Sequence, residues 1–303
     1  GQYKNFSYGT IKPWGWSRHT HRMFHKIKPL CDHLGVFADW DIAFRDLCGR
    51  HSSARMLESI VRQDFPYMVG IDALPQVINS FDQFASYIDS GKQFLLKSPW
   101  SSSGRGLMHY SGKELTSFQH QWINRVIEKQ GFVMLEPFHD KIFDYSMLFD
   151  VSGSNIKLLS LSTFKTHQHG KYQGSYLHWP KQLPFQDSAV NVDLLKDISK
   201  SVIQALQLMD IGSVFNGWIG VDAMVINKNG QLLVHPCLEL NCRYTMGHVA
   251  HVLSSLFPDH SQAFLKIGTV AEFQSSESTV FLLTPINPHT HFAAWVEMNK
   301  PRC

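Results

Sequence analysis

Two consecutive strand-like stretches carry acidic and amide side chains at a spacing suited to a divalent cation. Apolar and β-branched residues dominate both WIGVDAMVI and LLVHPCLEL, and the intervening NKNG is typical of a β-turn. Asp222 and Met224 share a face of the first strand, because side chains two apart point the same way. Glu239 and Asn241 likewise share a face of the second. Since Mg²⁺ prefers oxygen ligands, Asp222, Glu239 and Asn241 are candidate metal ligands.

Arg243 follows this pattern by two residues. A guanidinium group there could bind a phosphate or a carboxylate through two parallel hydrogen bonds. The alternative interpretation is an ordinary hairpin whose acidic residues face water. The choice between the two depends on the rest of the chain.

A second candidate site begins at Lys97, which ends the strand-like stretch QFLLK. The hydroxyl- and glycine-rich sequence SPWSSSGRG follows at once, and such a loop can direct its N–H groups at phosphates. It is neither a Walker A loop nor a Rossmann turn, because the Gly-Lys-Ser/Thr ending and the third glycine are missing. The phosphate-binding residues would be Ser101, Ser102, Ser103, Gly104 and Gly106. The alternative is an ordinary surface loop.

Further along, the strand-like stretch FVMLEPF could bind the base of a nucleotide. Glu136, Pro137 and Phe138 end this stretch, and Glu136 would lie near the amino group of an adenine. Asp144, eight residues beyond Glu136, could bind the two ribose hydroxyls.

These side chains need helices and strands to position them. Apolar spacing predicts helices over 52–64, after Ser80, up to Gly131, over 193–209 and over 248–256. The pairs Ser80/Gln83 and Ser111/Glu114 match the capping-box signature at two helix starts. The stretches YSMLFDV and IKLLSLS predict a β-hairpin. Residues 164–184 show no periodicity and predict a long polar loop.

The order of these pieces resembles the ATP-grasp superfamily. The resemblance rests on FLLKSPWSSSGRGL, VMLEPF, the acidic Asp144, GWIGVDAMV and LELNCR-x-x-MG, and it covers about residues 50–250. It implies an α+β fold in which two subdomains clamp ATP between antiparallel sheets. We expect an abbreviated N-terminal segment (1–50), a smaller subdomain (51–135), a larger subdomain with the Mg²⁺ site (136–275) and a C-terminal tail packed on the domain (276–303).

The resemblance also implies a role for each candidate residue. Lys97 would bind the α- and β-phosphates under the loop 101–106, and residues 134–138 would contact adenine together with Met224. Asp144 would bind the ribose, and Asp222, Glu239 and Asn241 would bind Mg²⁺. Arg243 would steady the transferred phosphate. The first ATP-binding lysine of the superfamily has no clear match, although Arg50 or Arg55 lies in that region.

The implied activity is an ATP-dependent ligase. A carboxylate would be activated as an acylphosphate and attacked by an amine, thiol or similar nucleophile, converting ATP to ADP and phosphate. The polar segment Phe164–Tyr176 is the candidate for recognising the acceptor, or else a solvated loop. Two alternatives are a small-molecule kinase and a nucleotide-binding protein that has lost its chemistry.

The composition narrows the class of protein. A net charge of +3 without a basic stripe argues against nucleic acid, and no apolar stretch reaches the roughly 18–20 residues that span a bilayer. Five cysteines without a C-x-x-C pair fit a reducing compartment, so a cytoplasmic location is expected. The identity of the substrates and the oligomeric state do not follow from the sequence.

Overall fold

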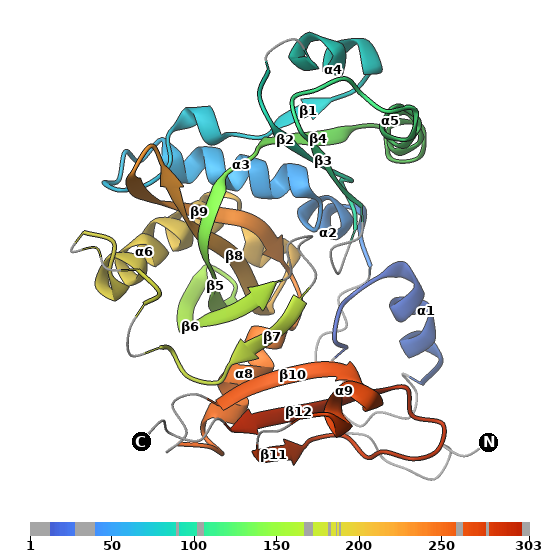
Figure 1. Ribbon diagram of the computed structural model, residues 1–303, viewed down its shortest axis with the longest axis vertical. Coiled ribbons are helices and arrows are strands. Elements are labelled where there is room, and N and C mark those ends of the chain that lie inside the picture. The colour runs from blue at the N-terminus through green and yellow to red at the C-terminus, as the bar shows by residue number, and fades with distance from the viewer. Residues whose placement is uncertain are drawn as a thin grey trace.

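The computed structural model of the chain describes residues 13–27, 40–88, 91–101, 106–166, 172–180, 183–185, 187, 189–258, 263–276 and 279–298. Within these residues the strands form one sheet of four and one sheet of eight. Figure 1 shows the four-stranded sheet with helices α4 and α5 at one end of the molecule and strands β10–β12 at the other. The central strands of the larger sheet lie between them.

The smaller sheet has the strand order β1-β4-β2-β3. Its strands are β1 (Gln76–Ile78), β2 (Phe94–Lys97), β3 (Leu107–Tyr110) and β4 (Val133–Pro137). Helices α4 (Phe81–Ile88) and α5 (Ser117–Gln130) cover one face. Fully buried side chains from both layers, including Phe84, Leu96 and Ile123, form its own hydrophobic core.

One of the two predicted helix starts in this region is confirmed and the other is wrong. The backbone N–H of Gln83 donates to Ser80 Oγ (3.2 Å), as a helix start at Ser80 requires. Helix α5, however, begins after Thr116, whose hydroxyl accepts from the N–H of Gln119 (3.2 Å) in a capping box. The Ser111 signature lies five residues too early, in the irregular segment between β3 and the helix.

The larger sheet has the order β11-β12-β10-β7-β6-β5-β8-β9. Strands β5 to β9 span Asp140–Ser152, Asn155–Thr166, Tyr172–Tyr176, Gly217–Lys228 and Gln231–Asn241, and β10 to β12 span Ala263–Thr269, Thr279–Leu282 and Phe292–Met298. Every pair is antiparallel. The hairpins predicted at β5–β6 and β8–β9 are therefore confirmed. The β8–β9 turn places Asn229 and Gly230 at φ 55° and 85°, which suits Asn-Gly.

Alternate residues of the central strands face a helical layer. Tyr145, Met147 and Phe149 of β5 pack in one core with helix α6 (Val192–Leu208) and helix α3 (Arg50–Val61). Both helices lie where apolar spacing predicts them. The remaining alternate residues of these strands therefore form the opposite face of the sheet, which carries the candidate site.

The predicted loop over 164–184 is partly wrong. Residues 164–166 end β6, and Tyr172–Tyr176 form β7, which pairs with both β6 and β10. Residues 167–171 lie outside the described part of the chain. A strand this short has too few residues to show a period of two, and its partners lie far away in sequence.

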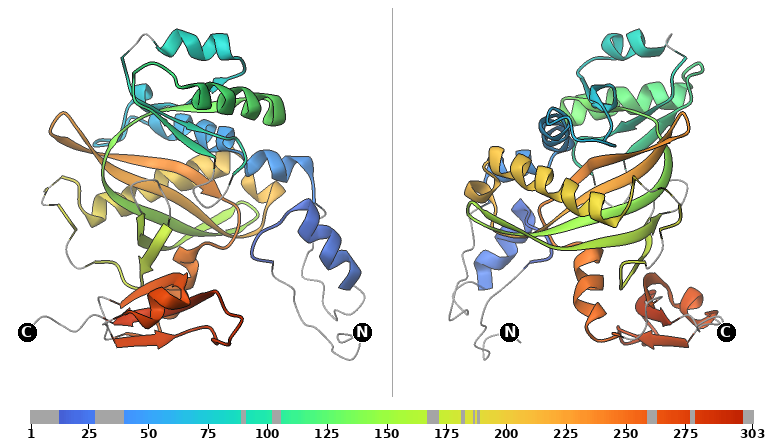
Figure 2. Two further views of the ribbon diagram at one scale, coloured as in Figure 1. Left: turned by 45° about the vertical axis from the view of Figure 1, so that its right-hand side comes forward. Right: turned by 90° about the vertical axis from the view of Figure 1, so that its left-hand side faces the viewer.

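The other helical elements are α1 (Arg18–Ile27), α2 (Ile42–Leu47), η2 (Ile71–Ala73), α7 (Ile211–Val214), α8 (Met246–Ser254) and α9 (Val270–Gln274). Figure 2 shows α8 between the central strands and β10–β12. The predicted subdomain boundaries stay predictions. No helix in the described ranges has the length and apolar character needed to cross a bilayer.

Candidate functional site

The candidate site residues lie in three neighbouring rows across strands β6, β5, β8 and β9. The backbone register aligns Ser162, Ser146, Asp222 and Glu239 in the middle row. Ser160, Leu148, Gly220 and Asn241 form the row on one side, and Asp144, Met224 and His235 lie in the row on the other. Residues directly opposite across strands share a face. All three rows therefore lie on the sheet face that α3 and α6 leave uncovered.

Asp222 is a partly buried carboxylate that accepts two hydrogen bonds. The Ser146 hydroxyl donates to Oδ1, and the Asn241 amide donates to Oδ2 (3.1 Å). Burial, and then the charge of Glu239, raise the pKa of Asp222 to about 6 despite these donors and the nearby Arg243. The negative charges of Asp222 and Glu239 repel each other across the two strands. A divalent cation bound between them would offset this repulsion.

Arg50, the first residue of α3, joins the two sheets at this point. Its guanidinium lies 3.5 Å from the Glu239 carboxylate and donates to Ser98 O (2.9 Å) and Ser101 Oγ (2.6 Å). Arg50 is only 7% exposed, and its Nε is buried without a hydrogen-bond partner. The end of β2 and the acidic end of β9, far apart in sequence, are thus held together by one cation.

The sequence left Arg50 and Arg55 as equal candidates, and the structure separates them. Arg55 pairs with the surface residue Asp46 (2.9 Å), away from the acidic row. Helix α3 is also anchored to β9 by Ser53, whose hydroxyl accepts from Leu240 N (2.9 Å). Position 50 therefore projects toward Glu239.

Lys97 forms a buried ion pair with Glu136. Its Nζ lies 2.5 Å from Glu136 Oε2, and the two side chains are 9% and 12% exposed. The two residues come from neighbouring strands, β2 and β4. Glu136, predicted to lie near an adenine amino group, thus also holds the predicted phosphate-binding lysine.

The loop after Lys97 closes on itself. Ser98 N donates to Gly106 O (2.8 Å), and Gly106 has φ +70°. A Cβ at position 106 would lie 2.7 Å from Ser98 Oγ, so the closure requires glycine there. Ser102, Ser103 and Gly104, also predicted as phosphate-binding, lie outside the described residues.

The predicted base- and ribose-binding residues come from the end of β4, from β5 and from β8. Asp144 accepts from Lys141 (2.6 Å) and from the Thr166 hydroxyl (2.9 Å). Met224 is buried, whereas Phe138 is half exposed and its ring lies 4.5 Å from that of His109. Pro137, which ends β4, pairs with Phe94.

Two histidines that the sequence did not single out, the buried His235 and the partly buried His139, lie beside these residues. His139 and His235 place their ring centroids 5.5 Å apart. Burial lowers both pKa values, that of His235 to about 3, so both rings are neutral at pH 7. His235 lies directly opposite Met224, so register, rather than any motif, would have located it.

Arg243 lies just beyond β9, where the sequence placed it. Its guanidinium donates to Tyr244 O (3.3 Å), and Gly15 packs against its aliphatic chain. Tyr244 N donates to Trp14 O (3.1 Å). The tryptophan-rich N-terminal stretch therefore braces Arg243.

The residues present fit a magnesium ion that shares its shell with a ligand. Asp222 and Glu239 supply two carboxylates in one row, and Asn241 supplies an amide in the adjacent row. Among the described residues, no group of three or more His, Cys, Asp and Glu side chains could hold a metal ion by itself. Two acids and an amide match Mg²⁺, which keeps water or phosphate oxygens as its remaining ligands.

No protein-family model matches the chain, and no curated protein matches it either. Solved structures do match. N5-carboxyaminoimidazole synthetase from Staphylococcus aureus with ADP superposes with a TM-score of 0.54 at 15% identity, covering 85% of this chain and 69% of that one. The biotin carboxylase domain of the Hydrogenobacter thermophilus 2-oxoglutarate carboxylase, with MgADP, ADP and bicarbonate, gives 0.59 at 14% identity, covering 96% and 70%.

Biotin carboxylase from Campylobacter jejuni, described as a β-γ-ATP complex, gives a TM-score of 0.59 at 11% identity, covering 96% of this chain and 71% of that one. At these identities the likeness shows the fold alone.

Proposed function

We propose that this chain, which has the ATP-grasp fold, is an ATP-dependent ligase that activates a carboxylate as an acylphosphate for attack by an amine or similar nucleophile. In the first step a carboxylate oxygen attacks the γ-phosphorus of ATP, and ADP leaves with the electron pair of the broken P–O bond. In the second step the nucleophile displaces phosphate from the acyl carbon and loses a proton.

The observation that carries this proposal is the bridge made by Arg50. It joins the Ser98–Ser101 end of the loop to Glu239 in the acidic row. Phosphate-binding groups and metal-binding groups must meet in an enzyme that transfers a phosphoryl group from a nucleotide. Arg50 lies where both would meet, and it is our candidate for the missing cation of the smaller subdomain.

The remaining roles follow from position. Lys97 and Arg50 would neutralise the phosphates, and Arg243 would steady the transferred group beside the acidic row. Asp222, Glu239 and Asn241 would hold Mg²⁺, which would offset the negative charge of the phosphates when bound. Met224 and the β4 end would contact the base, and Asp144 the ribose. Alignment and charge neutralisation account for most of the catalysis expected here.

The structural neighbours support the nucleotide part of the proposal. The synthetase from Staphylococcus aureus was solved with ADP, and a synthase from Aspergillus clavatus with ATP. The Hydrogenobacter thermophilus domain was solved with MgADP and bicarbonate. For this chain we propose ATP and Mg²⁺, with a small carboxylate and a nucleophile as substrates.

Calorimetric titration with a non-hydrolysable ATP analogue, with and without Mg²⁺, tests this function. We expect magnesium-dependent binding in the wild-type protein and its loss in Glu239→Gln. Glu128→Gln, an exposed residue of α5, is the matched control and should bind normally. ADP release in the presence of paired carboxylates and amines then tests ligation. An absence of analogue binding at every Mg²⁺ concentration would refute the proposal.

A further inference from the structure

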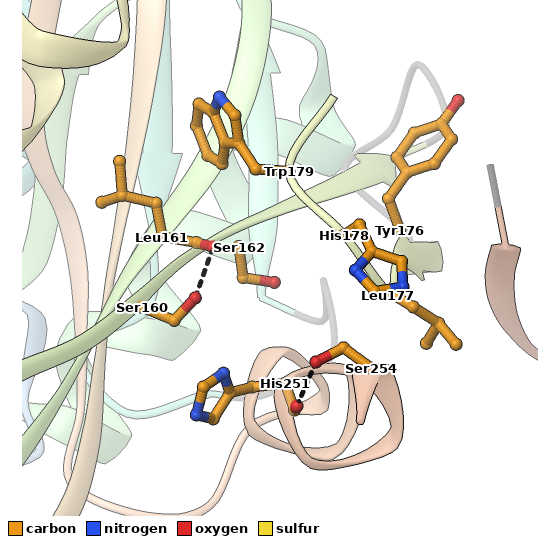
Figure 3. Close-up of a pocket in the computed structure, with 9 residues that line it drawn as sticks. All are labelled: Ser160, Leu161, Ser162, Tyr176, Leu177, His178, Trp179, His251 and Ser254. Carbon is orange, nitrogen blue, oxygen red and sulfur yellow. Dashed lines mark hydrogen bonds between the residues drawn. The ribbon is translucent and has the colours of Figure 1, made fainter. Parts of the chain in front are cut away.

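A cavity of about 120 Å³ lies against the larger sheet, beside the acidic row. Its walls come from β6, from the end of β7 with residues 177–179 after it, and from α8 (Figure 3). The lining residues are Ser160, Leu161, Ser162, Tyr176, Leu177, His178, Trp179, His251 and Ser254.

The cavity continues the rows that carry the proposed metal ligands. Ser162 lies opposite Ser146, which lies opposite Asp222 and donates a hydrogen bond to it. Strands are spaced about 4.8 Å apart, so Ser162 lies about 10 Å from Asp222 along this row. Ser160 continues the row of Asn241 in the same way. The cavity and the acidic row therefore share one face of the sheet.

Ser162 has a buried hydroxyl group that no other group satisfies. The residue is 6% exposed, and its Oγ is buried without a hydrogen-bond partner. Figure 3 shows this hydroxyl directed toward the space bordered by His178 and His251. An unsatisfied buried hydroxyl destabilises a fold by about 1–3 kcal/mol, so such groups are usually explained by a ligand or by water.

Helix α8 approaches strand β6 closely where Gly247 faces Ser162. A Cβ at Gly247 would lie 3.1 Å from Ser162 Oγ, which is a tight contact. On the other side, His178 Nε2 lies 2.8 Å from Phe257 O, an acceptor, and therefore donates to it. In the neutral ring this leaves Nδ1 as an acceptor.

The lining favours an uncharged polar ligand. Hydroxyl and imidazole groups supply donors and acceptors, while none of the nine described lining residues is Asp, Glu, Lys or Arg. A fixed charge would lose water there without gaining an opposite charge. The volume is large enough for several water molecules or for a small organic molecule.

We propose that this cavity is the subsite for the acceptor substrate, and that it binds the small, uncharged, hydrogen-bonding part of that molecule, such as a free-base amine or an amide. The acceptor role rests on the proposed function. The chemical class of the ligand rests on the cavity alone. A neutral nucleophile held here would lie on the same sheet face as the carboxylates that organise the phosphate.

Fluorine NMR on protein labelled with 5-fluorotryptophan tests the proposal, because Trp179 borders the cavity. Trp179→Phe identifies its resonance. Acetamide is the probe: it has four non-hydrogen atoms, and we expect a saturable shift of this resonance with a Kd of about 1 mM. Acetate, of equal size but charged, should bind at least tenfold more weakly.

Two substitutions at the C-terminal end of α8, one inside the cavity and one outside it, distinguish binding in the cavity from binding at the neighbouring surface. Ser254→Leu fills the cavity and should abolish the acetamide response. Ser255→Leu, at the exposed neighbouring position, should preserve it. Ser162→Val, which replaces the unsatisfied hydroxyl, should weaken the acetamide response at least tenfold.

An absent acetamide response, an equal response to acetate, or a full response in Ser254→Leu would overturn the ligand class. An intact response in a wild-type protein that binds no ATP analogue would instead overturn the ligase assignment and the acceptor role, and leave the ligand class standing.

Discussion

Replacing Asp222 by Asn should stabilise the metal-free protein, even though Asp222 is a proposed metal ligand. The fold raises the pKa of this carboxyl from 3.8 to about 6, through burial first and the charge of Glu239 second. A rise of this size corresponds to about 3 kcal/mol of destabilisation at pH 7.5. An asparagine side chain keeps the shape, can still accept from Ser146, and carries no charge.

The pH dependence of this destabilisation follows from the link between protonation of Asp222 and folding. Because the folded-state pKa lies above the unfolded value, the destabilisation is complete above about pH 6 and disappears below about pH 3.8. Asp222→Asn should therefore gain about 2–3 kcal/mol at pH 7.5 and almost nothing near pH 4. Some of the gain is lost because the Asn241 amide must rotate to avoid facing a second N–H donor.

Urea denaturation in EDTA at several pH values measures this gain, and the m-value checks that the unfolding transition is unchanged. The same variant should lose magnesium-dependent binding of the ATP analogue. A gain that is equal at pH 4 and pH 7.5 would refute the electrostatic reasoning. A net loss of stability at pH 7.5 would show that the two hydrogen bonds outweigh the cost of the buried charge.

Lys97→Met should weaken binding of the ATP analogue at least tenfold. It should also destabilise the fold by about 3 kcal/mol, because Glu136 is left buried and unpaired. Adding Glu136→Gln should restore the denaturation midpoint but not the calorimetric affinity. Gly212→Ala should destabilise by more than about 3 kcal/mol, since its Cβ would lie 2.0 Å from the backbone oxygen of Gly153, and a midpoint within 0.5 M urea of the wild type would contradict that contact. His235, with its pKa lowered from 6.5 to about 3, makes the fold lose about 2 kcal/mol between pH 7.5 and pH 5, because only the unfolded chain binds the proton; His235→Phe should remove most of this loss, and an equally steep acid limb in denaturation curves would rule the explanation out.

Elements with a strong local signal were predictable from the sequence. The β8–β9 hairpin combines alternating residues with an Asn-Gly turn, and α6 carries a long apolar stripe, so both were placed correctly. The start of α5 was not, because the Ser111 and Thr116 signatures compete locally. Gly112 has φ +78°, outside the helical region, and packs closely against the backbone of Gly91, so the helix begins only after Thr116. Tertiary packing decided between two similar local signals.

The candidate site also contains some residues that the sequence could bring together and others that only the folded structure brings together. Asp222, Glu239 and Asn241 come from one hairpin, so the sequence alone brings them together. Arg50 and Ser146 do not belong to that hairpin, and no motif marks them. Their roles depend on the packing of α3 against β9 and on the register of β5 with β8. The register needed to find Ser146 is fixed only once the whole sheet is assembled.

The contact between Arg50 and Glu239 also bears on synthesis. These residues are 189 positions apart, whereas the smaller sheet uses only residues 76–137. A chain emerging from the ribosome could complete the smaller sheet while Arg50 still lacks its acidic partner. That guanidinium would stay uncompensated until β9 emerges, long after the rest of its surroundings. Slow translation across residues 217–241 would therefore prolong a form of the protein that has the smaller sheet and still lacks Asp222, Glu239 and Asn241.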